Sequence, residues 1–467
     1  MNNKLTLLLS LFVLLTQGLQ AQKNSSTQLS LKQAQEYALK NSPLIKNATI
    51  DLETAKQKIW ETTSIGLPQI NGKVAGSYML ALPDKIKEFS SLNSLGLWMY
   101  NADQALKGLV PSSNQNFGRV PNPGPTTTVS DADQKWGLTL DITVSQLLFS
   151  GSYLVGLQAS RTFKQLSEVA ITKSENDLME AVTNAYFICV IAQENKMVID
   201  SIYLTTSKIL NEIKEIQKEG LMEETDVDQM QLTLTNIQNT KEMIDRQCEV
   251  ALNLLKYQMG MDLKDQIELK DNTDQLIGQL NAEVLVQKNL NLNNQVDYRM
   301  LEVQEKMAIL NVKLQKSTFL PDVAAFYNHQ ENFNKNSFSF TPPNVLGLSV
   351  NIPIFGSGQK FSRINQANLS VEKIKNGKQQ LSMGLQTQFS DARSSFITSM
   401  NKYQTNKQAR DLAYKIYSRS LIKYKEGILT SLELAQAQSQ YLQAQTNYYS
   451  SIIEMSSSYS KLEKLLK

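Results

Sequence analysis

The sequence predicts a mainly α-helical protein with a membrane β-barrel portion, in which a strand pair and a long helical hairpin occur twice. The repetition is visible in two motifs. Residues 218–231 read KEGLMEETDVDQMQ and residues 425–438 read KEGILTSLELAQAQ, while residues 149–152 read FSGS and residues 355–358 read FGSG. Long polar stretches with helical spacing flank the KEG motif in both copies. A period this long indicates a duplicated half of roughly 200 residues, not a solenoid unit of about 20–50.

The N-terminus has the features of a secretory signal peptide over residues 1–21. Lys4 is followed by the apolar run Leu5–Leu15, and Ala21 is a suitable cleavage residue. The apolar run is too short to span a membrane, and the alternative is a buried first helix. Elsewhere, no stretch approaches the roughly 18 apolar residues of a membrane helix. We therefore expect no helical membrane span in the mature chain.

The composition excludes several classes of function. The chain has 467 residues, a net charge of +3 and 41% hydrophobic residues. So small a charge predicts no nucleic-acid surface. A single histidine, His329, and two cysteines, Cys189 and Cys248, leave too few residues for a zinc site or a catalytic triad. Without a nucleophile elbow or a Gly-rich phosphate loop, the chain is predicted to be no enzyme and to need no metal or cofactor.

The predicted domains follow the duplication. The first repeat covers residues 22–261, an inter-repeat segment covers 262–290, and the second repeat covers 291–467. The first repeat opens with a helix at 30–64, with Ser30 as a candidate N-cap. Within it, Pro43 either kinks the early turns or starts a second helix. A helix at 294–317 repeats this element, and the segment 262–290, with one short strand and a helix cap, is either a linker or a collar.

Four strands are predicted, at about 67–80, 136–148, 320–330 and 345–354. Apolar residues alternate with small or polar ones in three of them, whereas Asp322–Asn328 alternates poorly. Such alternation over about ten residues is typical of membrane barrels, although an ordinary half-buried sheet is the alternative. The expected lipid-facing residues are Val74, Tyr78, Trp136, Leu138, Leu140, Ile142, Leu346, Leu348 and Val350. Because about eight strands are needed for closure, several chains must share one barrel.

Residues 81–135 connect the first two strands and form a much longer loop than residues 334–344, which connect the second two. A long loop at one end of a barrel usually faces the outside of the cell, so we expect an extracellular loop. Trp98, Met99 and Tyr100 give it an apolar spot. This spot is either a lid packed on its own neighbours or a ligand site.

Two helical hairpins are predicted, at 158–260 and 360–465. Apolar residues spaced alternately by three and four form a heptad seam in the first, broken only at Lys241. The seam residues are Val227, Met230, Leu234, Ile237, Ile244, Cys248, Ala251 and Leu255. Gly220 and Gly427 are the expected hairpin turns, because glycine tolerates the positive φ at which many helices end.

Together these residues resemble the TolC-type outer-membrane efflux protein family. The resemblance rests on the Leu-Pro pairs at 67–68 and 320–321, the FSGS and FGSG motifs, and the KEG turns followed by Thr225-Asp226-Val227 or preceded by Tyr424. It covers residues 29–467 apart from the loop at 81–135. It implies a homotrimer, with four strands per chain in a shared twelve-stranded barrel. That barrel would continue into an α-helical tunnel that crosses the periplasm.

The resemblance also implies a function and partners. The expected function is an outer-membrane duct that exports small molecules (drugs, toxic compounds) or secreted substrates. Its expected partners are outer-membrane lipid, a periplasmic membrane-fusion adaptor and an inner-membrane pump of the RND, ABC or MFS type. The residues leave the cargo open, and the alternative function is a structural periplasmic coiled coil without a channel.

In the family the periplasmic end is a gate, and its matching positions here are Thr225, Asp226, Tyr424 and Glu433. Two positions depart from the family pattern. Leu429 replaces a basic bonding partner, and Gln436 replaces one of two acidic ring positions. The resemblance therefore implies fewer ionic links in the shut state and a single acidic ring.

Two of the gate residues have alternative roles. Glu433 is expected about two turns into the descending helix, either as a cation-selecting ring in a trimer or as an ordinary solvated charge. Asp226 is expected to bond a neighbouring helix or to act as a favourable charge near a helix start.

The two cysteines lie at similar heights on the first hairpin. An oxidising compartment would permit a disulfide between Cys189 and Cys248. However, Lys196 and Lys241 are level with each other on the same two stripes, which argues against those stripes facing each other. Two buried thiols are the alternative. His329 is expected to be a surface or loop histidine near the end of a strand.

Overall fold

The computed structural model describes residues 27–78, 80, 98–102, 136–333 and 342–467. The predicted signal peptide and most of the loop at 81–135 therefore lie outside the described residues. The chain forms two compact units. One contains Arg161–Ile309, Leu369–Lys467 and the N-terminal residues up to Gln57, and the other contains Lys58–Ser160 and Leu310–Asn368. Each unit thus combines parts of both predicted repeats, so the repeats and the compact units do not coincide.

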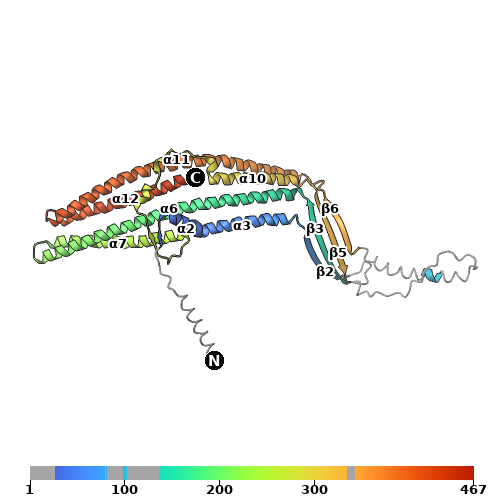
Figure 1. Ribbon diagram of the computed structural model, residues 1–467, viewed down its shortest axis with the longest axis horizontal. Coiled ribbons are helices and arrows are strands. Elements are labelled where there is room, and N and C mark those ends of the chain that lie inside the picture. Colours follow the sequence, from blue (N-terminus) through green and yellow to red (C-terminus); the bar gives the residue numbers. More distant parts are fainter. Residues whose placement is uncertain (1–26, 79, 81–97, 103–135, 334–341) are drawn as a thin grey trace, which may run out of the picture. The chain divides into compact units, whose positions relative to one another are not determined.

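Two antiparallel helical hairpins dominate the first unit (Figure 1). In the first hairpin, α6 (Gly151–Lys218) is followed by α7 (Glu224–Met259). The second hairpin consists of α11 (Gln359–Lys425) and α12 (Ser431–Leu466). The predicted heptad residues of α7 are all buried. Within the described residues, no helix is both long and apolar enough to cross a lipid bilayer.

The two hairpins begin differently. The FSGS and FGSG motifs lie at equivalent places in the two repeats, and the hairpins that follow them are predicted to start at residues 158 and 360. Instead, α6 begins at Gly151, directly after Ser150. In the second repeat a true turn precedes α11, because Ser357 and Gly358 adopt φ values of 49° and 79°. The extra glycine of FGSG permits this left-handed backbone.

Shorter helices extend along the hairpins. The first is divided at Ser42 into α2 (Leu31–Asn41) and α3 (Pro43–Ser64). Pro43 thus starts a second helix. Proline is suited to the first position of a helix, because a backbone N–H at that position would make no hydrogen bond within the helix and its absence costs nothing. Ser30 is the N-cap of α2 and forms a capping box with Gln33. The equivalent helix of the second repeat is α10 (Val296–Ser317).

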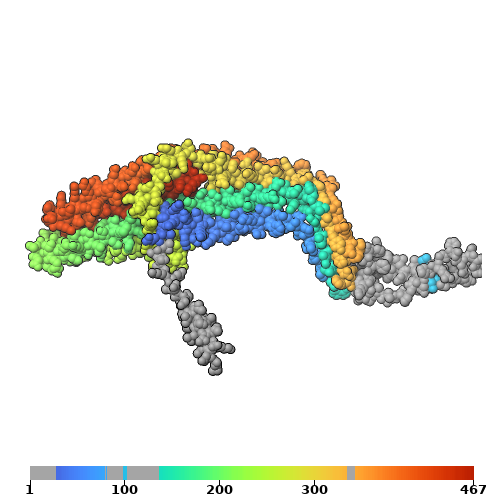
Figure 2. Space-filling view, in the orientation of Figure 1, coloured from blue at the N-terminus to red at the C-terminus, as the bar shows by residue number. Residues whose placement is uncertain are grey.

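The segment between the repeats lies across the hairpins and appears in yellow in Figure 2. It contains β4 (Ile267–Leu269), α8 (Thr273–Gly278), α9 (Ala282–Gln287) and a 3₁₀ turn, Leu292–Asn294. A strand that the sequence analysis missed, β1 (Thr27–Leu29), pairs with β4 in parallel. The Tyr186 hydroxyl reinforces this pair by donating to the Leu29 carbonyl at 2.8 Å and to Asp271 at 3.0 Å.

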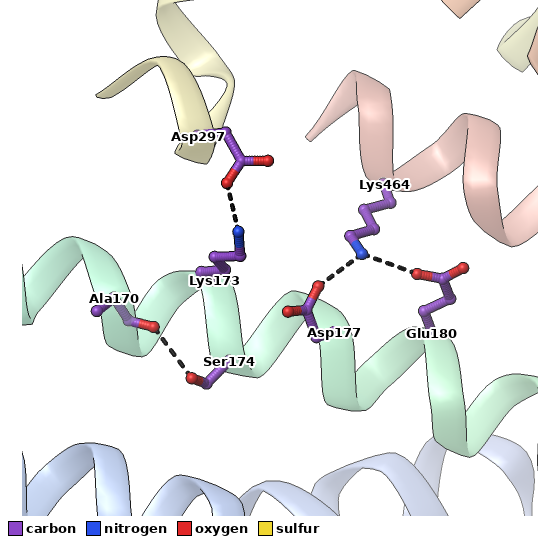
Figure 3. A network of polar contacts seen from close by, with 7 residues as sticks. All are labelled: Ala170, Lys173, Ser174, Asp177, Glu180, Asp297 and Lys464. Carbon is purple, nitrogen blue, oxygen red and sulfur yellow. Dashed lines mark hydrogen bonds and ion pairs between the residues drawn. The ribbon is translucent and has the colours of Figure 1, made fainter. Parts of the chain in front are cut away.

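Ion pairs join α6 both to the shorter helix α10 and to α12 of the other hairpin. Lys173 of α6 pairs with Asp297 of α10 at 2.6 Å. Lys464 of α12 pairs with both Asp177 and Glu180 of α6, at 2.6 and 3.0 Å (Figure 3). Since these side chains are partly exposed, each pair stabilises the fold only slightly, but together they set the register of the helices.

The second unit contains a four-stranded antiparallel sheet in the order β2-β3-β5-β6. The strands are β2 (Gln69–Tyr78), β3 (Trp136–Phe149), β5 (Asp322–Asn332) and β6 (Asn344–Asn351). The inner strands β3 and β5 come from different repeats, and a bulge lies between Leu147 and Phe149. At Gly347 a side chain would collide with the Phe326 ring, which lies 2.5 Å from where a Cβ would stand.

Candidate functional site

The sheet has one apolar and one polar face. Because directly paired residues share a face, the pairs Val74–Leu140, Tyr78–Trp136 and Tyr327–Leu346 lie on the same side. All nine residues predicted to face lipid lie on this face, and eight of them are exposed in the single chain. The eight exposed residues are Val74, Tyr78, Trp136, Leu138, Ile142, Leu346, Leu348 and Val350, and the ninth, Leu140, is half-buried. Such an apolar face is unusual for an isolated soluble sheet.

The opposite face of the sheet is polar. It carries Lys73, Asp141, Thr143, Asn328 and Gln330 in paired positions on three strands. The Asn328 amide donates to the Thr143 hydroxyl at 2.9 Å. His329 lies on the apolar face near the end of β5, where its Nδ1 is 2.8 Å from Asn344. Phe326 lies on the polar face, opposite Ser145 and Gly347, which explains why Asp322–Asn328 alternates poorly.

The tip of the two hairpins contains the four predicted gate residues. Gly220 and Gly427 have φ values of 75° and 72°, and each lies in the turn just beyond its helix, after Lys218 of α6 and Lys425 of α11. This left-handed conformation suits glycine, and a Cβ at either position would meet no atom within 4 Å. Substitution would therefore strain the backbone without a steric clash.

Asp226 joins the two hairpins at this tip. Its carboxylate, in the first turn of α7, accepts a hydrogen bond from the Ser431 hydroxyl at the start of α12. Ser431 is buried and Asp226 half-buried, so water competes poorly for this bond. A bond to a neighbouring helix is one of the two roles predicted for Asp226, and Ser431 of α12 is such a partner. Ser431 itself was not predicted, because serine near a helix start usually serves only its own backbone.

Tyr424 lies near Asp226 without a bond to it. Its hydroxyl oxygen is buried and has no hydrogen-bond partner among the described residues. Burial, and then the negative charge of Asp226, raise the pKa of Tyr424 above its usual value. Tyr424 is thus a buried hydroxyl that Asp226 influences by its charge but does not bond.

Glu433 lies elsewhere than predicted. The expected position was two turns into the descending helix, but α12 begins at Ser431 and Glu433 is in its first turn. There it forms a capping box, in which the Thr430 amide and hydroxyl donate to its carboxylate at 2.9 and 2.8 Å. These donors lower the pKa of Glu433 and keep it ionised. Within one chain, Glu433 therefore has a structural role as part of the helix cap. Its carboxylate is also exposed and thus accessible to ions.

The other predicted tip residues lie around this centre. Thr225 donates to Glu223 within its own turn at 3.3 Å. Leu429, at the position where the resemblance implies a basic residue, packs against the apolar cluster of the hairpins, and Met222 packs against the same cluster. Gln436 is exposed. An apolar contact therefore occupies the place of an ionic link.

The cysteines and lysines of the first hairpin correct one argument from the sequence. Cys189 and Cys248 are both buried and both free thiols. Burial raises the pKa of Cys189 to about 12. The stripes that carry Lys196 and Lys241 do face each other, contrary to the prediction. Lys196 pairs with Asp245 and Lys241 with Asp200, so each lysine meets an aspartate of the opposite helix.

The fold matches that of solved outer membrane channels, and the second repeat matches a family model in sequence. Residues 288–466 match the model of the family described as outer membrane efflux protein, which confirms the resemblance found in the sequence. The Campylobacter jejuni CmeC outer membrane channel is similar in fold, with a TM-score of 0.66 and 18% identity over 93% of this chain and 85% of that chain. No curated protein is similar enough in sequence to count as a match.

Two further solved structures are similar to the chain. A membrane protein from Pseudomonas aeruginosa gives a TM-score of 0.68 at 13% identity, over 94% of this chain and 92% of that chain. The open state of the Neisseria gonorrhoeae MtrE outer membrane channel gives 0.66 at 14% identity, over 93% and 88%. The chain therefore has the fold of these channels: long helical hairpins attached to a small antiparallel sheet, as the sequence predicts.

Proposed function

We propose that this chain is one subunit of an outer-membrane duct for efflux. The observation that carries the proposal is the four-stranded sheet with an apolar and a polar face, in a chain with the fold of outer membrane channels. An apolar outer face suits lipid, and a polar inner face suits a water-filled passage. Four strands cannot close a barrel, so three copies together form a twelve-stranded one.

The helical hairpins extend the duct through the periplasm and narrow it at the tip. In this arrangement Thr225, Asp226, Tyr424 and Glu433 of three copies surround one axis. The Ser431–Asp226 bond and the packing of Leu429 against the apolar cluster of the hairpins hold the tip shut. Three exposed Glu433 carboxylates around the axis favour cations over anions. The duct has no catalytic step and uses no cofactor.

Energy and cargo come from other proteins. A periplasmic membrane-fusion adaptor and an inner-membrane pump of the RND, ABC or MFS type deliver the cargo, which is small toxic molecules or secreted substrates. The family description of residues 288–466 as an efflux protein supports this role.

The test is to measure the location, the mass and the conductance of the protein. We expect the protein in the outer-membrane fraction, with a detergent-corrected mass of three chains and discrete channel conductance in planar lipid bilayers. A water-soluble monomer without conductance would contradict the proposal. That result would favour a structural periplasmic coiled coil.

A further inference from the structure

The end of the sheet that joins the helices carries exposed apolar side chains on all four strands. Because β2 follows α3, β5 follows α10, and β3 and β6 lead towards α6 and α11, the strands meet the helices at one end (Figure 1). Ile354 is 92% exposed and Phe355 88% exposed, so nothing in the described part of the chain covers them. We call the exposed apolar residues at this end the apolar belt: Leu67, Phe149, Phe319, Leu320, Ile352, Ile354 and Phe355.

A cluster of two aromatic rings and a lysine borders the apolar belt on the side of the helices. The Lys360 ammonium, in the first turn of α11, lies 5.1 Å from the centre of the Phe319 ring and donates to the Thr318 carbonyl at 2.5 Å. The Phe319 ring lies 5.3 Å from the ring of Phe361. The aliphatic part of Lys360 thus lies near aromatic surface, and its charge lies at the margin of the apolar belt.

Two further basic residues lie next to this cluster in the chain. Lys316, in the last turn of α10, and Arg363, in the second turn of α11, are both exposed. The nearest acidic residues of these helices, Glu305 and Glu372, are roughly two turns away or more, and Asp322 is the one acidic residue at these strand ends. Since the helix dipole disfavours cations in the first turns, α11 itself does not explain its basic residues there.

The length of the apolar run along β6 indicates the depth of this cluster in a membrane. The apolar positions of β6 continue beyond the strand through Ile352 to Ile354. From Leu346 to Ile354 an extended chain spans about 27 Å, which a strand tilt of about 40° reduces to roughly 20 Å of height. The apolar band of a membrane barrel is about 25 Å tall. Ile354 therefore lies near the edge of that band, and Lys360 and Arg363 follow beyond it.

From this arrangement we infer that the helical end of the sheet binds the phosphate groups of phospholipids, with Lys316, Lys360 and Arg363 as the contacts. Basic side chains that follow apolar surface reach lipid head groups with their charged ends, and the guanidinium group binds phosphate through two parallel hydrogen bonds. Phe319 and Phe361 lie at the same level, as aromatic residues do at the edges of membrane barrels. The inference rests on the proposed outer-membrane duct and specifies the lipid chemistry that the duct recognises.

Titration with single lipid species in detergent tests this site. We would add phosphatidylglycerol, and separately phosphatidylcholine with the same acyl chains, and count the lipids bound per trimer by native mass spectrometry. Phosphatidylglycerol should bind more tightly, because choline neutralises the phosphate charge and glycerol does not. Lys316→Gln combined with Arg363→Gln should raise the half-saturating concentration of phosphatidylglycerol about tenfold, since each basic residue adds to the attraction of an anionic lipid.

Matched controls separate this site from a general effect of charge. Lys316→Arg keeps the charge and should bind phosphatidylglycerol at least as tightly as the parent chain. Lys415→Gln with Arg419→Gln removes two exposed charges near the other end of α11 and should leave lipid binding unchanged. Glycerol phosphate should not displace the lipid, because it lacks the acyl chains that the apolar belt contacts. Helical circular dichroism equal to that of the parent chain confirms that each variant is folded.

The outcomes separate the inference from the proposed function. Equal binding of phosphatidylglycerol by the parent chain and by the Lys316→Gln, Arg363→Gln variant would overturn the inference, and so would an equal loss in the α11 control. Displacement by glycerol phosphate would also overturn it, because the site would then bind a free anion and not a lipid. Each of these results leaves the duct intact if the detergent-corrected mass is three chains. A mass of one chain would contradict the proposed function itself.

Discussion

Ser431 donates a hydrogen bond to Asp226 and so joins the first turn of α12 to the first turn of α7. This bond links the two repeats at the end of the hairpins. Nearby, Leu429 stands at the position where the family resemblance implies a basic residue. If this bond helps to keep the tip shut, its removal should open the duct.

The first prediction concerns this bond. Ser431→Ala and Asp226→Ala should each raise single-channel conductance, and the double variant should raise it no further than the stronger single one, because both remove the same interaction. A hydrogen bond to a charged group contributes about 1.5–3 kcal/mol to the stability of the folded state. Because Asp226 is partly exposed, we expect the contribution of this bond to lie near the lower end of that range. Ser439→Ala, at an exposed serine of α12, is the control. Strictly additive effects of the two changes would argue that they act separately.

The second prediction separates the charge of Glu433 from its capping role. Glu433→Gln removes the charge but keeps an acceptor for the Thr430 amide, whereas Glu433→Ala removes both. Both variants should lower cation preference and weaken block by divalent cations, but only Glu433→Ala should also lower the melting temperature clearly. Reversal potentials in a salt gradient measure the preference. Glu249→Gln, far along α7, should change neither property, and unchanged selectivity in both Glu433 variants would remove the ring assignment.

The third prediction follows from the pKa of Glu433, which the Thr430 donors lower. A lowered pKa keeps the carboxylate charged as the pH falls, and its contribution disappears only when the pH passes below the folded value. Thr430→Val removes the hydroxyl donor and should raise this pKa. Cation preference should then be lost at a higher pH in the variant than in the parent. Coincident pH profiles would show that the hydroxyl does not control the ionisation.

The fourth prediction concerns the crossed ion pairs between α6 and α7. Their lysines lower the pKa of Asp245, with Lys196 as the main cause, so the stabilisation is present above the unfolded pKa and fades as the pH falls through the folded value. Lys241→Asp should lower the melting temperature, and adding Asp200→Lys should restore most of the loss. The restoration should shrink in high salt, since screening weakens partly exposed pairs. A double variant no better than the single one would show that the pair contributes nothing.

The fifth prediction tests the two faces of the sheet. Leu140→Arg places a charge on the apolar face and should destabilise the protein in lipid vesicles by about 2–4 kcal/mol if it lies near the bilayer midplane. Thr139→Arg, one residue earlier, points to the polar face and should be tolerated. Urea unfolding in vesicles, followed by tryptophan fluorescence, compares the two variants. Equal effects would argue against lipid on one side only.

Much of this fold could be predicted from the sequence, because its elements are long and periodic. The seam of α7 and the alternation of β3 are local patterns that burial imposes on the chain. In contrast, β1 is three residues long, and its partner β4 is far along the chain, so no local pattern indicates it. The prediction that the stripes of Lys196 and Lys241 do not face each other was wrong, because periodicity shows which residues share a stripe but not that an aspartate of the opposite helix pairs with each lysine.

The tip was harder to predict than the strands. The sequence identified the turn glycines, because their backbone needs are specific. It misplaced Glu433 because the helix start was not assigned, although Thr430 and Glu433 have the three-residue spacing of a capping box, which is the signal that could have located it. Ser431 went unnoticed for a related reason: its partner lies in the other repeat, and one sequence contains no signal for that distance.

The mixing of the two repeats in each compact unit has a consequence for biogenesis. The inner strands β3 and β5 belong to different repeats, and so do the helices α6 and α12 that Lys464 joins. When the ribosome has completed only the first repeat, β3 lacks its neighbouring strand β5, and α6 lacks the helix α12 that packs against it. The first repeat therefore completes neither compact unit by itself, and these surfaces stay uncovered until the second repeat has been synthesised.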